Sequence, residues 1–301
     1  MKTVDYSVVD HIVIGAGSAG CALAYRLARA GFSVLLLEAG SPARNPLLHI
    51  PLGFAFLLKP HKHNWNYQTL PEPGLHNRRI DLPRGKVLGG CSAINGMVYV
   101  RGQAADYDRW AALGNPGWSY DEVLPYFTRS EDCENGADAW HGTGGPLWVG
   151  NVRNEFPVCD DFIAAAQQAG HPLNRDINAA TQAGVGYFPH NIRQGRRLSS
   201  ASAFLGAGQG LPNLRVMTRA LARRVLVEQG RAVGVDVLVG GRPQRIRAQR
   251  EIILCGGAIN SPQLLERSGI GQADRLRALG IAVTQDLPGV GENLHDHWNA
   301  Y

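Results

Sequence analysis

The sequence lacks the features that mark several large classes of protein. It contains no apolar run long enough for a membrane-spanning helix, no internal repeat and no low-complexity tail. Asp5 and Asp10 interrupt the segment where a signal peptide would need an apolar core. Cysteine is scarce: the five residues are widely spaced and form no Cys-x-x-Cys pair, which favours free thiols in a reducing compartment. We therefore expect a cytoplasmic protein, with peripheral attachment to a membrane as the alternative.

A large excess of charge of one sign is also missing. The 30 basic and 25 acidic residues leave a net charge of +5, and no basic stripe is interleaved with aromatic residues, which argues against binding of nucleic acid. Arginine pairs such as Arg196-Arg197 and Arg223-Arg224 are typical of solvated surface. Glycine, by contrast, is abundant, with 37 residues, and 45% of the chain is hydrophobic. This is enough for the core of one large domain and part of another.

The N-terminal segment has the pattern of a strand, a glycine-rich turn, a helix and a second strand. His11 to Ile14 is a short apolar run typical of a buried parallel strand, and GAGSAG follows it from Gly15 to Gly20. An alanine-rich segment then predicts a helix to Ala30, stopped by Gly31. A second strand is predicted from Ser33 to Leu37. This order is the opening of a dinucleotide-binding fold.

Each glycine of this turn has a different expected role. Gly15 allows the tight turn, Gly17 lets the backbone approach a diphosphate at the helix N-terminus, and Gly20 permits close packing of the helix. Glu38, at the end of the second strand, is placed to accept hydrogen bonds from the ribose of adenosine. Its charge disfavours a 2′-phosphate, so the pattern predicts FAD or NAD rather than NADP.

A second glycine-rich run, GKVLGGCSAINGMVYVRG from Gly85 to Gly102, suits a backbone pressed against a large flat ligand. Gly89 and Gly90 lack a Cβ, so the chain there can adopt unusual dihedral angles and bring amide groups close to a ring system. Ser92 and Asn95 add short hydrogen-bonding groups. Together with the N-terminal turn, this run points to a flavin.

Three strand-like runs in the C-terminal half predict an antiparallel meander, which a plain NAD-binding fold does not have. They cover Leu221 to Glu228, Ala232 to Val239 and Arg242 to Ala248. Glu251 to Cys255 then has the pattern of a separate buried strand. The small residues from Gly256 to Ser261 suit either close approach to a ligand or a tight strand-to-helix turn, and both interpretations stay open.

Capping signals predict three further helices. Ser261 caps one of them, with Pro262 at the first helical position. A capping box at Ser119 begins another, which continues through Thr128, and an amphipathic helix covers Phe156 to Ala169.

Two apolar features have more than one interpretation. The segment from Ile50 to Leu58 is broken by Pro51 and Gly53; it either covers a cofactor, touches a membrane or is a buried loop, and burial is the default. For the tryptophans of the middle part, core packing is the commoner use and a substrate pocket the alternative. These are Trp65, Trp110, Trp118, Trp140 and Trp148.

We identify no metal site and no catalytic base in the sequence. His295 and His297 flank Asp296, but alternating residues point to opposite sides and no further ligand stands at metal-binding spacing. Structural hydrogen bonding is therefore their expected role. We assign His141 to a turn, and interpret Cys91 as a small buried filler rather than a reactive thiol.

The chain resembles the glucose-methanol-choline (GMC) oxidoreductases, FAD enzymes that oxidise alcohols, over essentially its whole length. The motifs that carry the resemblance are GAGSAG with Glu38, the run from Gly85 to Gly102, GGAINSPQLLERSGIG from Gly256 to Gly271, and VGENLHDH from Val290 to His297. The resemblance implies an α/β fold, with a Rossmann-like parallel sheet, the antiparallel meander and part of an α+β substrate domain.

The resemblance also implies which residues bind the cofactor. The ADP half of FAD would be bound by Gly15, Gly17, Ser18, Ala19, Gly20 and Glu38, with the backbone of Ala222 at the adenine. Along the flavin and the diphosphate lie Val87, Gly90, Cys91, Asn95, Gly96, Met97 and Val98. Some members attach FAD covalently through a histidine at the position of Ile94, so noncovalent FAD is expected here.

The resemblance divides the chain into regions. Residues 8–102 and 210–297 would form most of the FAD-binding part, and residues 103–209 a cap or substrate-side region. Family members continue beyond the last residue of this chain, into a part that holds most of the substrate-facing sheet and the catalytic histidine. A hydride acceptor needs a base that takes the hydroxyl proton, and that base is expected in the further part.

The expected reaction is oxidation of a primary alcohol to an aldehyde, with hydride transfer to flavin N5. The run from Gly85 to Gly102 is most similar to choline dehydrogenases and related bacterial alcohol dehydrogenases. Choline, aliphatic alcohols and polyethylene glycols stay open as substrates, and oxygen or a quinone-like carrier as the electron acceptor. The alternatives are a flavin-binding module without catalysis, an NAD dehydrogenase, and a lyase that shares the FAD site. The sequence does not predict the oligomeric state.

Overall fold

The computed structural model of the chain describes residues 8–153 and 156–296. These residues form two compact units, each made of segments that are separate in the sequence. The first unit comprises residues 8–44, 55–94 and 200–296, and the second comprises residues 45–54 and 95–199. The N-terminal turn and the C-terminal meander therefore belong to one unit.

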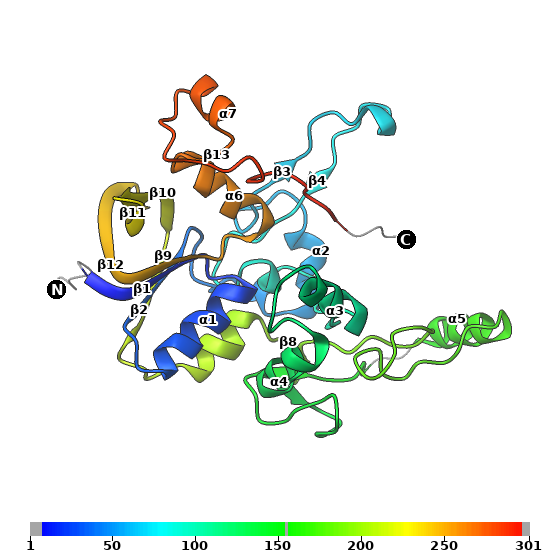
Figure 1. Cartoon of the computed structure of the whole chain (residues 1–301). Helices are drawn as coiled ribbons and strands as arrows, with labels where there is room; N and C mark the ends of the chain where they lie inside the picture. Colours follow the sequence, from blue (N-terminus) through cyan, green and yellow to red (C-terminus); the bar gives the residue numbers. More distant parts are fainter. Residues whose placement is uncertain (1–7, 154–155, 297–301) are drawn as a thin grey trace. The chain divides into compact units, whose positions relative to one another are not determined.

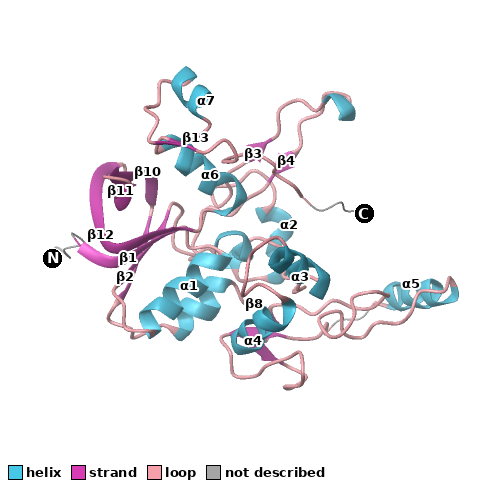
Figure 2. Cartoon of the chain, viewed as in Figure 1, coloured by secondary structure: helices cyan, strands magenta, loops and turns pink. Residues whose placement is uncertain are grey.

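A six-stranded sheet, with strand order β10-β11-β12-β1-β2-β9, forms the centre of the first unit (Figures 1 and 2). Its strands are β1 (Val8–Ile14), β2 (Val34–Glu38), β9 (Leu214–Thr218), β10 (Ala220–Glu228), β11 (Arg231–Val239) and β12 (Arg242–Leu254). β1 pairs in parallel with β2 and β12, and β2 with β9, whereas β11 pairs antiparallel with β10 and β12. The expected parallel sheet and antiparallel meander are both present, in a single sheet.

The predicted third strand of the meander and the buried strand after it are one strand. The first part of β12, from Arg242 to Arg247, pairs antiparallel with β11, and the part from Arg247 to Leu254 pairs in parallel with β1. The prediction of a separate strand from Glu251 is therefore wrong, because the chain changes partner without leaving the extended conformation. Strand β9, at the other edge of the sheet, was not predicted.

Apolar residues of the sheet and two helices form the core of this unit. All five residues of β2 are buried, as expected for a parallel strand covered on both faces. Helix α1 (Ser18–Arg29) buries its small residues, Cys21, Ala24 and Ala28, and contacts β1, β2 and β9 (Figure 1). Helix α6 (Gly257–Arg267) contacts β10 through the buried Leu264.

The other elements of the first unit are short. They are the strand pairs β3 (Tyr67–Gln68) with β4 (Asp81–Leu82) and β13 (Ile270–Gly271) with β14 (Gln285–Asp286), helix α7 (Ala273–Ala278), 3-10 turns at Pro73–Leu75 and Gly90–Ala93, and a π-helical turn at Ala201–Leu205.

Short helices, short strands and loops make up the second unit (Figure 2). Its elements are 3-10 turns at Pro46–Leu48 and Pro51–Gly53, helices α3 (Ala104–Ala112), α4 (Tyr120–Ser130) and α5 (Pro157–Gln168), and strands β5 (Glu131–Cys133), β6 (Leu147–Val149), β7 (Ile192–Arg193) and β8 (Arg196–Arg197). The capping box of Ser119 and Glu122 is confirmed, and α5 ends close to the predicted position.

Several apolar side chains are more exposed than we expected. The segment from Ile50 to Leu58 includes helix α2 (Phe54–Leu57); Leu57 is buried, but Leu52 and Phe56 are 69% and 59% exposed. The default expectation of a buried loop is wrong for most of its large side chains. Trp110 and Trp118 are also about half exposed and pack edge to face on one another rather than in a core. No helix among the described residues is both long enough and apolar enough to cross a membrane.

Candidate functional site

The turn between β1 and α1 forms one wall of a cavity in the first unit. Gly15 has a φ of +101°, and a Cβ there would lie 2.4 Å from the carbonyl oxygen of Cys255. A Cβ at Gly20 would lie 1.9 Å from the carbonyl oxygen of Gly15. A side chain at either position would therefore force the turn apart from the helix or from the end of β12.

The N-terminus of α1 opens into this cavity. Gly17 is the N-cap residue, and within this fully described helix the first turn has neither a side-chain cap nor an acidic residue. Ser18 and Ala19 line the cavity. The backbone N–H groups of the first turn and the positive end of the helix dipole are thus available to an anion. This is the arrangement that a diphosphate requires.

The second glycine-rich run meets this turn through its backbone. The N–H of Gly89 donates to the carbonyl of Ala16 at 2.8 Å. Gly90 has a φ of +54°, and a Cβ there would lie 2.6 Å from the Cα of Gly17. The two glycine-rich runs, distant in sequence, are therefore in direct backbone contact.

A third segment, at the end of β12 and the start of α6, forms another wall. The N–H of Cys255 donates to the carbonyl of Ile14 at 2.7 Å, and residues from Cys255 to Ser261 line the cavity. Helix α6 begins at Gly257, so the prediction that Ser261 caps it is wrong; Ser261 and Pro262 lie inside the helix. The small residues here serve both as a tight turn and as a cavity wall.

These segments enclose a cavity of about 520 Å³, which is within the range of small-molecule sites. Eight residues predicted to bind the cofactor line it: Gly15, Gly17, Ser18, Ala19, Glu38, Gly90, Cys91 and Ala222. Gly20 and Val87 are buried outside the lining, where they contribute to packing. Trp65 and Arg84, which the sequence did not identify as cofactor residues, also line the cavity.

Glu38 is the one carboxylate among the described residues that line the cavity. Its side-chain oxygens accept hydrogen bonds from the N–H groups of Ala16, at 3.0 Å, and Gly40, at 2.8 Å. Burial raises the pKa of Glu38 to about 7, although these two hydrogen bonds and the charge of Lys86 oppose that shift. A carboxylate has about four acceptor positions, so Glu38 keeps capacity for ribose hydroxyls.

Cys91 adds an exposed thiol to the cavity lining, and Trp65 adds a flat aromatic surface. The side chain of Cys91 is exposed, and its Sγ accepts a hydrogen bond from the N–H of Gly85 at 3.4 Å. The prediction of a buried filler is therefore wrong. Trp65 stacks on Tyr67, with ring centroids 5.8 Å apart, and the ammonium of Lys86 lies 4.4 Å from the centroid of the indole.

The other predicted cofactor residues, from Asn95 to Val98, belong to the second unit. The Oδ1 of Asn95 accepts hydrogen bonds from the N–H of Met97, at 3.1 Å, and from Arg197, at 2.9 Å. Asn95, Gly96 and Val98 are exposed, whereas Met97 is buried and has a φ of +65°. Local hydrogen bonds thus define this turn, and its role in binding the cofactor stays a prediction.

A buried ion network in the second unit was not predicted from the sequence. Glu131 is fully buried, and its carboxylate lies 2.6 Å from Arg101 and 3.2 Å from the Nδ1 of His141. The Nε2 of His141 is 2.9 Å from Asp176. His141 therefore has a wider role than the turn to which the sequence assigned it.

The same cluster brings three potential metal ligands together. Single ligand atoms of Glu131, Cys133 and His141 all lie within 4.8 Å of one another. However, the guanidinium of Arg101 already pairs with the carboxylate, and burial raises the pKa of the Cys133 thiol, which disfavours the thiolate that a metal would need. We interpret the cluster as an ion network.

His295, near the end of the described residues, does not line the cavity. His295 is exposed, and Asp296 lies 3.7 Å from Arg84. His297 lies outside the described residues.

Comparison with known proteins gives matches along nearly the whole chain. The family model described as GMC oxidoreductase matches residues 9–299. An oxygen-dependent choline dehydrogenase of Sinorhizobium medicae is 47% identical over 295 residues, which cover 97% of this chain and 53% of that protein. One of Brucella anthropi is 44% identical over 293 residues, with the same coverage. The chain spans about half the length of the curated relatives it matches.

Solved structures share the fold of this chain. Pyridoxine 4-oxidase from Mesorbium loti is 36% identical, with a TM-score of 0.89 over 93% of this chain and 55% of that one. An FAD-dependent oxidoreductase from Chaetomium thermophilum is 33% identical, with a TM-score of 0.89 over 96% and 52% of the two chains. A formate oxidase of Aspergillus oryzae is 29% identical, with a TM-score of 0.89 over 98% and 53%. The expected α/β fold class is confirmed.

Proposed function

The chain belongs to the GMC oxidoreductase family, and on this premise we propose that it is the FAD-binding part of an enzyme that oxidises a primary alcohol to an aldehyde. The observation that carries the proposal is the convergence of three small-residue segments and Glu38 on one cavity of the first unit. A Cβ at Gly15 or Gly90 would collide with neighbouring backbone, so glycine is needed to form this cradle.

The residues of the cavity fit the ADP half of FAD. The first turn of α1, with Ser18 and Ala19, offers N–H groups to the diphosphate. Glu38 accepts hydrogen bonds from the ribose hydroxyls. Ala222, whose backbone meets the adenine, stands where β10 shifts its register against β11, and such a bulge interrupts the regular ladder.

When bound, FAD supplies the acceptor for a hydride. The residues of the chain hold that acceptor in place and keep water from it. Ile14, Leu37 and Leu254 give the cavity apolar walls. By family resemblance, we expect Val87, Gly90 and Cys91 of the first unit to lie along the flavin and the diphosphate. Ile94 is buried and has no nucleophilic atom, so this position offers no covalent bond to FAD, and we expect noncovalent binding.

The base that takes the hydroxyl proton lies outside this cavity in our proposal. Among the described residues that line it there is no histidine, and the single carboxylate, Glu38, is assigned to the ribose. The oxygen-dependent choline dehydrogenases among the relatives favour choline as the alcohol and oxygen as the acceptor. A quinone-like carrier is the alternative acceptor.

An absorbance spectrum tests this proposal. The purified chain is mixed with FAD, separated by gel filtration and then exposed to choline, a primary aliphatic alcohol or polyethylene glycol. Flavin bands that elute with the protein and stay unbleached are expected. Bleaching by an alcohol would place the base in this chain, and loss of the flavin would contradict FAD binding by this part alone. Retention of NAD instead would favour a nicotinamide enzyme.

The pH dependence of FAD binding tests Glu38. Because the folded-state pKa of Glu38 is raised to about 7, the carboxylate is mostly protonated below that pH and cannot accept both ribose hydrogen bonds. FAD affinity is therefore expected to fall as the pH is lowered, by about tenfold between pH 8 and pH 6. Fluorescence titration measures it.

Glu38→Gln should bind FAD more weakly at pH 8, by about tenfold or more, and lose this pH dependence. Glu228→Gln, at an exposed glutamate of the same sheet, is the control and should keep the wild-type profile. If FAD affinity depends on pH in Glu38→Gln as it does in the unsubstituted chain, Glu38 does not bind the ribose.

A further inference from the structure

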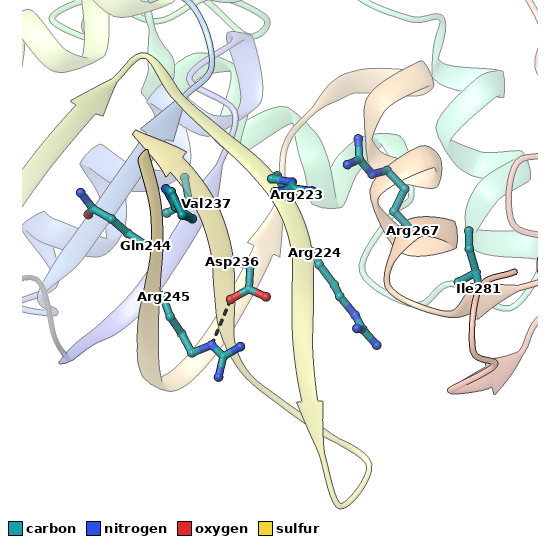
Figure 3. A pocket seen from close by; sticks show the side chains of 9 residues that line it. Arg223, Arg224, Asp236, Val237, Gln244, Arg245, Arg267 and Ile281 are labelled. Atoms are coloured by element: carbon teal, nitrogen blue, oxygen red, sulfur yellow. Dashed lines mark hydrogen bonds and ion pairs between the residues drawn. The ribbon is translucent and has the colours of Figure 1, made fainter. Parts of the chain in front are cut away.

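A second pocket lies on the meander of the first unit. It has a volume of about 680 Å³ (Figure 3). Four arginines and one carboxylate line it, a net charge of +3. These residues are Arg223, Arg224, Asp236, Arg245 and Arg267. Apart from Arg267, none of them lines the cavity proposed to bind FAD.

The fold gathers these arginines in an unusual way. Arg223 and Arg224 are consecutive in β10, and in a regular strand their side chains would point to opposite faces. The pairing of β10 with β11 shifts register between Ala222 and Arg224, and both arginines line the same pocket. Arg267, the last residue of α6, extends from the other side (Figure 3).

The positive charge of the pocket is only partly offset. Asp236 pairs with Arg245 at 3.0 Å. Arg223, Arg224 and Arg267 are exposed, and no carboxylate of the described residues lies within ion-pair distance of them. Like charges in one pocket repel each other, and a multivalent anion between them would convert that repulsion into attraction.

We propose that this arginine pocket binds a small, soluble ligand that carries two or more phosphate groups. Guanidinium groups present forks of N–H donors that match phosphate oxygens in pairs. Three unpaired arginines from a strand and a facing helix can surround such an anion. Pro243 and Ile281 give the pocket an apolar edge for the carbon skeleton of a phosphorylated molecule.

The arginine pocket also has a link to the dinucleotide cavity. Arg267 lines both. Because two anionic ligands would share one cation, each is expected to weaken the binding of the other, and by thermodynamic linkage to the same extent. This coupling rests on the proposed FAD site, whereas binding of the phosphate ligand does not.

Calorimetric titration of the FAD-free chain with inorganic triphosphate tests the proposal. We expect saturable binding of one triphosphate per chain, weakened at least about tenfold in Arg223→Gln/Arg224→Gln. Gln244→Glu, which adds a carboxylate to the pocket without removing an arginine, should weaken it as well. Arg242→Gln is the matched control: this arginine is exposed on the same sheet but does not line the pocket, and its loss should leave the affinity unchanged.

Three results would overturn the proposal. One is the absence of saturable binding, and another is an equal loss of affinity in Arg242→Gln and in the double variant. The third is binding to vesicles of phosphatidylglycerol but not to triphosphate, which would make the pocket a lipid site. FAD retention is measured separately on the same variants, so failure of the FAD site and failure of the arginine pocket are distinguishable.

Discussion

Replacement of Gly90 by alanine is expected to weaken FAD binding by at least about 100-fold, so that the flavin no longer elutes with the protein. The φ of Gly90, +54°, costs a residue with a Cβ about 1–2 kcal/mol. The added atom would also lie 2.6 Å from the Cα of Gly17, which is backbone and the N-cap of α1. To relieve this clash, the run from Gly85 to Cys91 must move away from the turn that offers N–H groups to the diphosphate. Fluorescence titration with FAD measures the loss.

Gly74→Ala is the matched control for this substitution. Gly74 belongs to the same unit, has no positive φ, and a Cβ there would meet no atom within 4 Å. It should retain FAD like the unsubstituted chain. If Gly90→Ala binds FAD with unchanged affinity, the contact between the two glycine-rich runs is not part of the cofactor site.

The N-terminal turn could be predicted residue by residue because its signals are local. Gly15, Gly20 and Glu38 stand at fixed places after a buried strand, within a helix and at the end of the next strand, and the structure places them accordingly. The geometry of such a turn depends on the backbone of a few consecutive residues. The residue types that this backbone conformation requires can therefore be recognised directly in the sequence.

The predictions that proved wrong concern features that depend on contacts between segments distant in the sequence. The continuity of β12 depends on β1 and β11 offering partners on successive stretches of one strand, which no local pattern records. Cys91 is exposed, with its Sγ accepting a hydrogen bond from Gly85, and α6 begins at Gly257, four residues before the expected cap Ser261. Ser261 was predicted as a cap because the local sequence, a serine followed by a proline, is typical of a helix N-terminus.

Pairs of charges are equally hard to infer. Arg101 is separated from Glu131 in the sequence by helices α3 and α4, and His141 follows Glu131 after ten residues, so only the fold shows that the three are buried together. Arg223-Arg224 was expected at the solvated surface, and both residues are exposed, but the sequence did not indicate that they line one pocket beside a register shift of β10. A β-bulge has no reliable sequence signal, although an arginine pair inside a strand pattern could have prompted the question.

Glu131→Gln is expected to lower the free energy of unfolding of the second unit by about 3–5 kcal/mol. The carboxylate is fully buried and pairs with Arg101, whose side chain is 2% exposed. Loss of the negative charge would leave the guanidinium buried without its counter-charge, and the carbonyl of Trp140, which accepts a hydrogen bond from Arg101, is a neutral partner. Urea denaturation followed by tryptophan fluorescence measures the change.

The expected loss of stability depends on the burial of the ion pair, and an exposed pair of the same chemistry tests that dependence. Glu228 pairs with Arg247 at 2.7 Å, but both side chains are about half exposed, so Glu228→Gln should leave the urea midpoint unchanged. The double variant Arg101→Met/Glu131→Leu removes both buried charges. It should be more stable than Arg101→Met alone or Glu131→Leu alone, because neither charge is then buried without its partner. Equal effects of Glu131→Gln and Glu228→Gln, or a double variant less stable than both singles, would show that the network does not stabilise the second unit through paired buried charge.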